Sequence, residues 1–202
     1  MELIVVDHLP CLNNELGLCT GLSKQGVSDF GRSVAELVWL DDDVLKDVTT
    51  ILSSTLPRAV ETVRLCFRQL PVRLVFDERL AAIDYGVCHD FPMDVIQRGQ
   101  EDHIYRPYPQ GESYADMASR YRSCLQDSAA ALCGQRAIII GHYGTREILN
   151  HLVTGTPLDE AFRIRARARG NTSLSTSDAR KAAIKQRILA RRYAMFQFHA
   201  TV

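Results

Sequence analysis

The hydrophobic residues of this chain fall into two kinds of pattern. Short runs at 3–6, 49–52 and 137–141 have the length and composition of buried strands; the first and third are apolar throughout, and the second begins with two β-branched threonines. Between and after these runs, apolar residues recur every three or four positions, which predicts helices over 28–38, 57–67, 112–132 and 146–152. Buried strands that alternate with helices are typical of an α/β fold with a parallel sheet.

The remaining segments show other patterns. Residues 172–175 and 193–198 alternate between polar and apolar positions, so we expect strands there. Arginine occupies every second position of 163–169, which we interpret as one solvated strand face rather than a substrate-binding stripe. Residues 83–111 are rich in Gly, Pro, His, Asp and Tyr and lack a period, which predicts an irregular, lid-like excursion over the sheet edge. No repeat or linker divides the sequence, so we expect a single domain over 1–202.

Two histidines and one arginine follow the predicted strands. His8 closes the first apolar run and His142 closes the run at 137–141. Arg58 follows Pro57 in the first turn of a predicted helix. In open α/β sheets, ligands bind where strand ends and helix N-termini open onto one crevice. We therefore expect these three side chains to lie together at that edge.

Charge and cysteine content narrow the possible classes. The 24 basic and 24 acidic residues cancel, so no net field favours nucleic acid or an anionic membrane as a partner. No apolar stretch approaches the ~20 residues that cross a bilayer. The six cysteines show no paired spacing and the N-terminus enters a strand directly, so we expect reduced thiols and a cytoplasmic location. No pair of possible metal ligands has the spacing of a metal site, so we expect no bound metal. The residues that could donate to one are Asp7, His8, Cys11, His89 and His142.

A series of motifs, taken in order, resembles the histidine phosphatase superfamily, whose fold is phosphoglycerate mutase-like. His8 is followed at the family's spacing by Asn14, and then by a stretch that includes Ser23. Residues 53–62 match Ser-Ser-x-Leu-x-Arg-Ala-x-x-Thr. Three further matches complete the series: Gly111-Glu112-Ser113 with Arg120, Gly141-His142-Tyr143-Gly144, and Asn171-Thr172-Ser173. Each motif is weak alone, but their joint order and spacing extend over nearly the whole chain.

This resemblance implies a three-layer sandwich in which a mostly parallel central sheet is flanked by helices. It also implies phosphoryl transfer without a cofactor, in which a histidine attacks phosphorus and water or a second acceptor then cleaves the phosphohistidine. Carried over by position, His8 is the nucleophile, His142 the second histidine and Arg58 a phosphate clamp. The implied substrate is a small molecule, a phosphate ester. The other substrate-binding candidates are Asn14, Ser23, Tyr143 and Arg146.

Two positions depart from the family's pattern near the nucleophile. Asp7 stands where the family has arginine, and Leu9 stands where it has glycine. A carboxylate ~4 Å from a phosphate would oppose it by a few kcal/mol at an effective dielectric of ~20. Such a contact would weaken phosphate binding by orders of magnitude.

The family's acid is also replaced. Its position falls on Ala82, which cannot donate a proton. Asp84 is a candidate substitute and catalytic residue, but spacing does not choose between it and three alternatives: Glu78, His89 and Asp90. General acid catalysis raises a reaction rate by a factor of roughly 10²–10⁴, so its loss alone would slow hydrolysis rather than abolish it.

Two functions therefore remain open. The first is an atypical phosphatase-like enzyme acting on a small phosphorylated metabolite through His8, with Arg146 or an arginine of 163–169 replacing the lost clamp. The second is a repurposed member that uses Asp7, His8 and His142 for acid–base chemistry, or a degenerate one that only binds a ligand or partner. We favour the first because Arg58 and both histidines are retained. The sequence leaves a homodimer open.

Overall fold

The computed structural model describes residues 1–35, 45–169, 177–190 and 194–197. Its centre is a five-stranded sheet in the order β3-β2-β4-β1-β5. The strands are β1 (Glu2–Asp7), β2 (Val48–Ser53), β3 (Arg73–Phe76), β4 (Arg136–Gly141) and β5 (Ala194–Gln197). Strands β1 to β4 run parallel, and β5 pairs with β1 in the antiparallel direction. The prediction of a mostly parallel sheet is confirmed.

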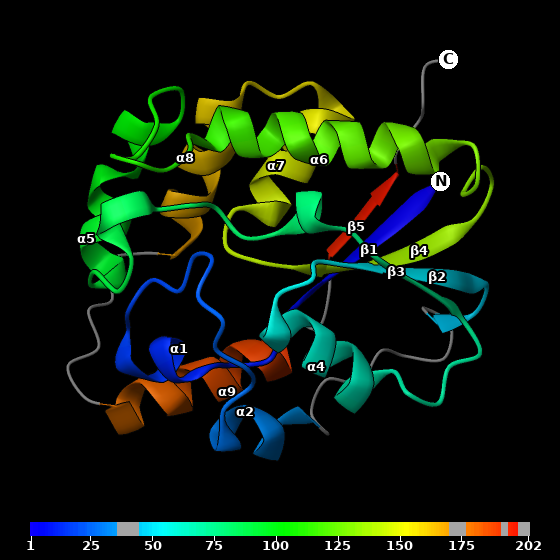
Figure 1. The fold of residues 1–202 in the computed structure, drawn as a ribbon, viewed down its shortest axis with the longest axis horizontal. Coiled ribbons are helices and arrows are strands. Elements are labelled where there is room, and N and C mark those ends of the chain that lie inside the picture. Colours follow the sequence, from blue (N-terminus) through cyan, green and yellow to red (C-terminus); the bar gives the residue numbers. More distant parts are fainter. Residues whose placement is uncertain (36–44, 170–176, 191–193, 198–202) are drawn as a thin grey trace.

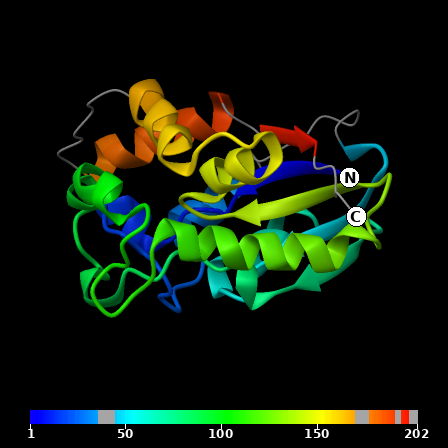
Figure 2. The same ribbon diagram turned by 90° about the horizontal axis from the view of Figure 1, so that it is seen from above.

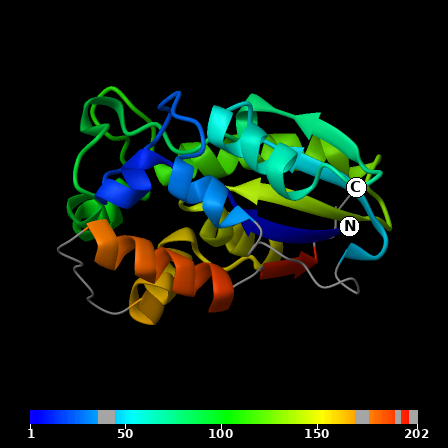
Figure 3. The same cartoon turned by 90° about the horizontal axis from the view of Figure 1, so that it is seen from below.

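Helices cover both faces of this sheet (Figures 1 and 2). One face carries α6 (Tyr114–Ala129), α7 (Thr145–Thr154) and α8 (Leu158–Arg169). The other carries α4 (Pro57–Cys66), with α1 (Leu12–Leu16), α2 (Asp29–Ser33) and α9 (Ser177–Ala190) beyond it (Figure 3). The predicted three-layer α/β sandwich is therefore confirmed. No helix of the described residues is long and apolar enough to span a bilayer.

Strand β1 shows why its sequence is continuously apolar. Successive side chains on a strand point to opposite faces. Leu3 and Val5 pack into the core beneath α6 and α7, whereas Ile4 and Val6 pack into the core beneath α4. A strand covered on both sides needs apolar residues at every position, which produces an unbroken run.

Local sequence signals determine where several helices begin. Pro57 occupies the first turn of α4. Backbone N–H groups in a first turn have no partner within the helix, so a proline there breaks no hydrogen bond. Ser28 caps α2 by accepting a hydrogen bond from the Gly31 amide at 3.0 Å. At the start of α6, the Ser113 hydroxyl accepts from the Asp116 amide at 3.1 Å, and the Asp116 carboxylate accepts from the Ser113 amide at 2.9 Å. This reciprocal pair is a capping box.

Three of the four helices predicted from periodicity are confirmed, as α4, α6 and α7. The fourth is shorter than the predicted 28–38, because α2 ends at Ser33 and Val34 has left the helical conformation. Residues 36–44 lie outside the described part of the chain. Neither β3 nor α9 corresponds to a predicted element.

The arginine-rich segment at 163–169 is helical, so the prediction of a strand face is wrong. It forms the end of α8, whose buried residues Leu158, Ala161 and Phe162 recur at helical spacing. Arg163 pairs with Asp159 one turn earlier. The predicted strand at 172–175, with the late Asn171-x-Ser173 motif, lies outside the described residues, whereas β5 covers most of the predicted strand at 193–198.

Two long segments gather where the parallel strands end (Figure 1). One connects β1 to α2 through α1. The other is the predicted lid-like stretch at 83–111, which is not wholly irregular: it contains η3 (Gly86–Cys88), α5 (Met93–Gly99) and η4 (Gln100–His103). The Met93 amide donates to the Gly17 carbonyl at 2.8 Å, which joins the two segments. All six cysteines are free thiols.

Candidate active site

Three strand ends bring together four side chains that we call the histidine–arginine cluster: His8, Ser54, Arg58 and His142. His8 follows β1, Ser54 follows β2, Arg58 lies in the first turn of α4, and His142 follows β4. Parallel pairing of β1 with β4 places the two histidines side by side, with ring centroids 5.0 Å apart. The structure thus brings together His8, Arg58 and His142, the three residues singled out from the strand ends.

His8 is held in one tautomer. Its Nδ1 lies 2.7 Å from the Leu9 carbonyl oxygen, which can only accept, so Nδ1 carries the proton. Its Nε2 then bears a lone pair, and this atom accepts a hydrogen bond from Arg58 Nε at 3.2 Å. The Leu9 amide donates to Thr62 Oγ1 of α4 at 2.8 Å, which fixes the backbone next to the imidazole. The lone pair of His8 therefore faces the cluster.

Arg58 is the buried cation of the cluster, with 1% of its surface exposed. Its Nη2 donates to the Gly21 carbonyl at 2.7 Å, and its Nη1 donates to the Ser23 carbonyl at 3.0 Å. Nη2 also lies 3.4 Å from His142 Nδ1. The guanidinium is therefore fixed by backbone carbonyls and both imidazoles. Its planar fork suits two oxygens of one phosphate.

His142 is 3% exposed and also has a defined tautomer. Arginine only donates, so Nδ1 of His142 is the acceptor and Nε2 carries the proton. That proton is donated to Ser54 Oγ at 2.8 Å. The His142 amide donates to Thr145 Oγ1 at 2.9 Å, which anchors the residue at the start of α7. Ser54 thus positions the second histidine from the end of β2.

Burial keeps both histidines neutral. It lowers the pKa of His8 to about 4, together with the charge of Arg58 and against smaller opposite effects of the Leu9 carbonyl and Asp7. Burial, followed by the influence of His8 and Arg58, lowers the pKa of His142 well below its ordinary value. Burial also lowers the pKa of Arg58, to about 10, so this residue remains protonated at pH 7. Near neutral pH the cluster combines a neutral imidazole lone pair with a fixed positive charge.

Asp7 directly precedes His8, and its carboxylate pairs with Arg146 rather than with Arg58. Its side chain is 62% exposed, and its carboxylate accepts from Arg146 Nη2 at 3.2 Å. The alternation of β1 explains this direction: Val6 packs beneath α4, so Asp7 turns to the opposite face, where α7 begins. Arg146, a predicted replacement for the missing clamp, therefore neutralises the carboxylate that stands in the clamp's position.

The position of the family's acid is closed to solvent. Ala82 is 4% exposed, and its carbonyl accepts from Arg120 Nη2 at 3.0 Å. Arg120 in turn pairs with Glu112 at 2.6 Å, and the Glu112 carboxylate accepts from the Asp84 amide at 3.0 Å. These contacts hold the backbone on both sides of residue 83.

The four predicted substitutes for the acid lie in different surroundings. Glu78 is exposed at the start of η2 (Glu78–Leu80). Asp90 is exposed and accepts from Asn13 Nδ2 at 2.6 Å. Asp84 and His89 form a pair, with Asp84 Oδ1 3.1 Å from His89 Nε2. Both members of this pair are partly exposed.

Three predicted substrate-binding residues make the following contacts. Asn14 Oδ1 accepts from the Cys11 amide at 2.9 Å and so caps α1. Ser23 contacts the cluster through its carbonyl, and its hydroxyl accepts from the Gln25 amide at 3.3 Å. The Tyr143 hydroxyl donates to Gln100 Oε1 at 2.5 Å, on η4. Sequence reasoning did not single out Gly21, whose contribution is a carbonyl and therefore has no side-chain signature.

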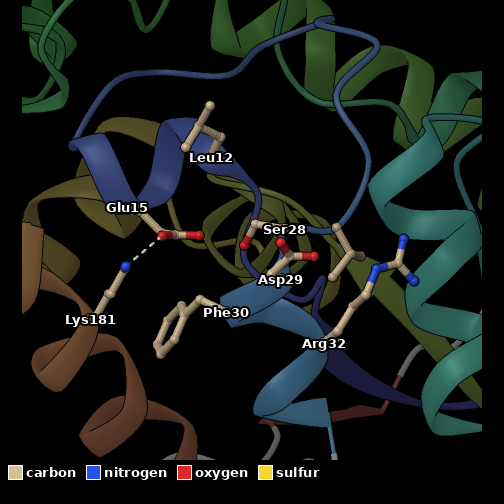
Figure 4. A pocket seen from close by; sticks show the side chains of 8 residues that line it. Leu12, Glu15, Ser28, Asp29, Phe30, Arg32 and Lys181 are labelled. Carbon is tan, nitrogen blue, oxygen red and sulfur yellow. Dashed lines mark ion pairs between the residues drawn. The ribbon is translucent and has the colours of Figure 1, made fainter.

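The described residues contain no group of three His, Cys, Asp or Glu side chains placed to hold a metal ion. A separate pocket lies between α1, α2 and α9 (Figure 4). Its lining residues are Leu12, Glu15, Val27, Ser28, Asp29, Phe30, Arg32 and Lys181. Lys181 and Glu15 form an ion pair at 3.2 Å there. None of the four cluster residues lines this pocket.

The mostly parallel sheet thus carries two neutral histidines and a buried arginine at the carboxyl edge of its parallel strands. The sequence pattern of the histidine phosphatase superfamily (branch 1) matches residues 13–188, and the chain belongs to this superfamily. The "Putative phosphoserine phosphatase 2" of Hydrogenobacter thermophilus is 28% identical over 181 residues, covering 86% of this chain and 88% of its own. A "Probable phosphoglycerate mutase GpmB" of Yersinia pestis is 24% identical over 186 residues, covering 88% and 85%. The protein is a phosphatase-like hydrolase.

Solved structures share its fold. A mycobacterial glucosyl-3-phosphoglycerate phosphatase superposes with a TM-score of 0.68 at 18% identity, over 80% of this chain and 83% of that one. Bacillus stearothermophilus YhfR superposes with a TM-score of 0.65 at 22% identity, over 87% of each chain. At these identities the likeness shows a common fold.

Proposed function

We propose that this protein hydrolyses a small phosphorylated metabolite through a phosphohistidine formed on His8. One observation carries the proposal: the proton of His8 is on Nδ1, tied to Leu9, while Nε2 carries a lone pair directed at Arg58. A neutral imidazole is a competent nucleophile near pH 7. The lowered pKa of His8 keeps the ring in that form down to about pH 4.

Arg58 and His142 supply the binding of the phosphoryl group in this proposal. A phosphate oxygen replaces His8 Nε2 as the acceptor of the Arg58 Nε proton, which frees the lone pair to attack phosphorus. The charge of Arg58 is already oriented, so little reorganisation accompanies the transition state. A bound dianion also favours protonation of His142, because a negative charge beside the imidazole stabilises the imidazolium form.

The named relatives support a monoester of a small hydroxylated metabolite as the substrate. Phosphoserine, phosphoglycerate and glucosyl-3-phosphoglycerate, the compounds in their names, all carry phosphate on the oxygen of a small polar molecule. The pairing of Asp7 with Arg146 removes the main electrostatic objection to a phosphate ligand. It also argues against acid–base chemistry by Asp7, because that carboxylate turns to the α7 face.

The test is phosphate release from a broad panel of phosphate monoesters by the intact protein and by His8→Ala. The matched control is His103→Ala, which removes an imidazole from η4, where the ring stacks on Tyr108. We expect release by the intact protein and by His103→Ala, and no release above background by His8→Ala. Release that persists in His8→Ala, or no release from any ester by the intact protein, would contradict the proposal.

A further inference from the structure

We infer that His89, oriented by Asp84, is the proton donor to the leaving group in place of the missing acid at Ala82. The inference deepens the proposed function and rests on it. It selects one of the four candidates that the sequence left open. Three features of the structure lead to it: the pairing of His89 with Asp84, the unpartnered second nitrogen of His89, and the contact of that nitrogen with the backbone that holds Arg58.

The first feature is the orientation of the ring. Asp84 Oδ1 is a hydrogen-bond acceptor 3.1 Å from His89 Nε2, so Nε2 carries a proton. The carboxylate is itself fixed, because the same oxygen accepts from the Gly86 amide at 2.9 Å. The His89 amide donates to the Gly86 carbonyl at 3.3 Å. Asp84 is thus a positioning residue that holds the imidazole with Nε2 toward its carboxylate.

The second feature is the other ring nitrogen. His89 Nδ1 is buried and has no hydrogen-bond partner among the described residues. Burying a nitrogen without a hydrogen-bond partner is unfavourable, so this atom is suited to a partner that arrives with the substrate. Because Nε2 is held by Asp84, Nδ1 is the atom from which a proton can leave.

The third feature is location. Gly21 has φ +46, and a methyl group built on it would lie 2.3 Å from His89 Cε1 and 2.6 Å from His89 Nδ1. The carbonyl of the same residue accepts from Arg58 Nη2 at 2.7 Å, and Arg58 Nε donates to His8 Nε2. A single glycine backbone therefore separates the Nδ1 edge of His89 from the cation that binds the phosphate. Any side chain at Gly21 would therefore displace the imidazole of His89.

The proton and electron movements balance over the two steps. As His8 Nε2 bonds to phosphorus, the ester P–O bond breaks, and its electron pair stays on the leaving oxygen. In this step His89 starts with a proton on each ring nitrogen. The leaving oxygen takes the Nδ1 proton, which leaves His89 neutral with its remaining proton on Nε2. In the second step, water attacks the phosphohistidine and gives a proton to His89 Nδ1, while the N–P electron pair returns to His8.

The test compares two esters that differ in their need for a proton. The 4-nitrophenolate of 4-nitrophenyl phosphate leaves without protonation, whereas the alkoxide of glycerol phosphate requires it. We expect His89→Gln to raise the ratio of kcat/KM for the aryl ester to that for the alkyl ester by roughly 10²–10⁴. Asp84→Asn should raise the same ratio, and the control His103→Gln should leave it unchanged.

The ratio separates a catalytic loss from a structural one. An unchanged ratio in His89→Gln, whether both rates fall together or neither changes, overturns the inference. Failure of the proposed function has another signature, because aryl-ester hydrolysis would then persist in His8→Ala. Retained dependence on His8 with an unchanged ratio in His89→Gln therefore rejects the role of His89 alone.

Discussion

The ion pair between Asp7 and Arg146 shows how the fold alters the effect of a single residue. In the sequence, Asp7 replaces an arginine and introduces a negative charge beside His8. In the structure, that charge is compensated at 3.2 Å by a residue 139 positions later in the chain. The compensation depends on the β1–β4 pairing and on the start of α7. No spacing within the sequence could reveal it.

We predict that Arg146→Gln weakens phosphate binding. Removing the guanidinium leaves the Asp7 carboxylate unpaired near the cluster, and its field should raise the inhibition constant of inorganic phosphate roughly 3- to 10-fold. The stability effect should be within ~1 kcal/mol because the Asp7 side of the pair is largely exposed to solvent. Inhibition by phosphate, measured at low ionic strength, checks this. The double variant Asp7→Asn/Arg146→Gln should restore phosphate binding. If it binds phosphate as weakly as the single variant, electrostatic compensation is not the role of Arg146.

At the residue scale, the sequence predicted the side chains but not their surroundings. His8, Arg58 and His142 were identifiable because each follows a strand end or a helix start. The carbonyls of Gly21 and Ser23 that fix Arg58 were not, because a carbonyl is common to every residue. The choice of His89 among the substitute acids depends on its contact with Gly21, which is likewise visible only in three dimensions.

At the element scale, chain segments are predictable where local interactions suffice to define them. Pro57 and the Ser113–Asp116 capping box mark the starts of α4 and α6 within a few residues of sequence. The alternating arginines at 163–169 led to the wrong prediction of a strand, because a period of two in one residue type does not show which positions are apolar. The buried positions at the start of α8 show the helical period. Strand β3 escaped prediction because four residues, three of them exposed, give too short a pattern.

The capping box at the start of α6 should contribute to the stability of the protein. Ser113→Ala removes one half of the capping box and leaves the Asp116 amide without its hydroxyl acceptor. We expect the free energy of unfolding to fall by about 1 kcal/mol. Urea unfolding measures the change. Ser119→Ala, on the exposed face of the same helix, should change it by less than ~0.5 kcal/mol. Equal effects of the two substitutions would rule out the capping interaction as the cause.

The whole molecule buries two neutral histidines at one edge of its sheet, which links its stability to pH. Burial lowers the pKa of His8 to about 4 and that of His142 well below its ordinary value, whereas imidazoles in the unfolded chain titrate near 6.5. Between about pH 6.5 and pH 4 the unfolded chain therefore binds more protons than the folded one. The free energy of unfolding should fall as the pH is lowered through this window and recover as it is raised.

Urea unfolding at ~pH 7, ~5.5 and ~4.5 checks this dependence, with an expected loss of up to roughly 1.4 kcal/mol per histidine for each pH unit. The double variant His8→Asn/His142→Asn serves as the control, and its stability should depend less on pH over the same range. If the two proteins show the same pH dependence, the buried histidines are not its source.

At the scale of the whole molecule, the fold was predictable because one pattern recurs. Continuous apolar runs alternating with amphipathic stretches define a doubly covered sheet, and the ordered motifs extend the prediction over most of the chain. The joining of the 8–28 and 83–111 segments across the sheet edge was not predictable. It rests on backbone hydrogen bonds such as that between Met93 and Gly17, which link segments far apart in sequence.

The most direct test of this account is to trap the phosphorylated enzyme. The protein is mixed with 4-nitrophenyl phosphate, quenched in alkali during turnover to preserve a phosphohistidine, and digested for mass spectrometry. We expect one phosphoryl group, labile in acid and stable in base, on the peptide that contains His8, and none in His8→Ala. A phosphoryl group on another residue, or hydrolysis with none trapped under rapid quenching, would contradict the assignment of His8 as the nucleophile.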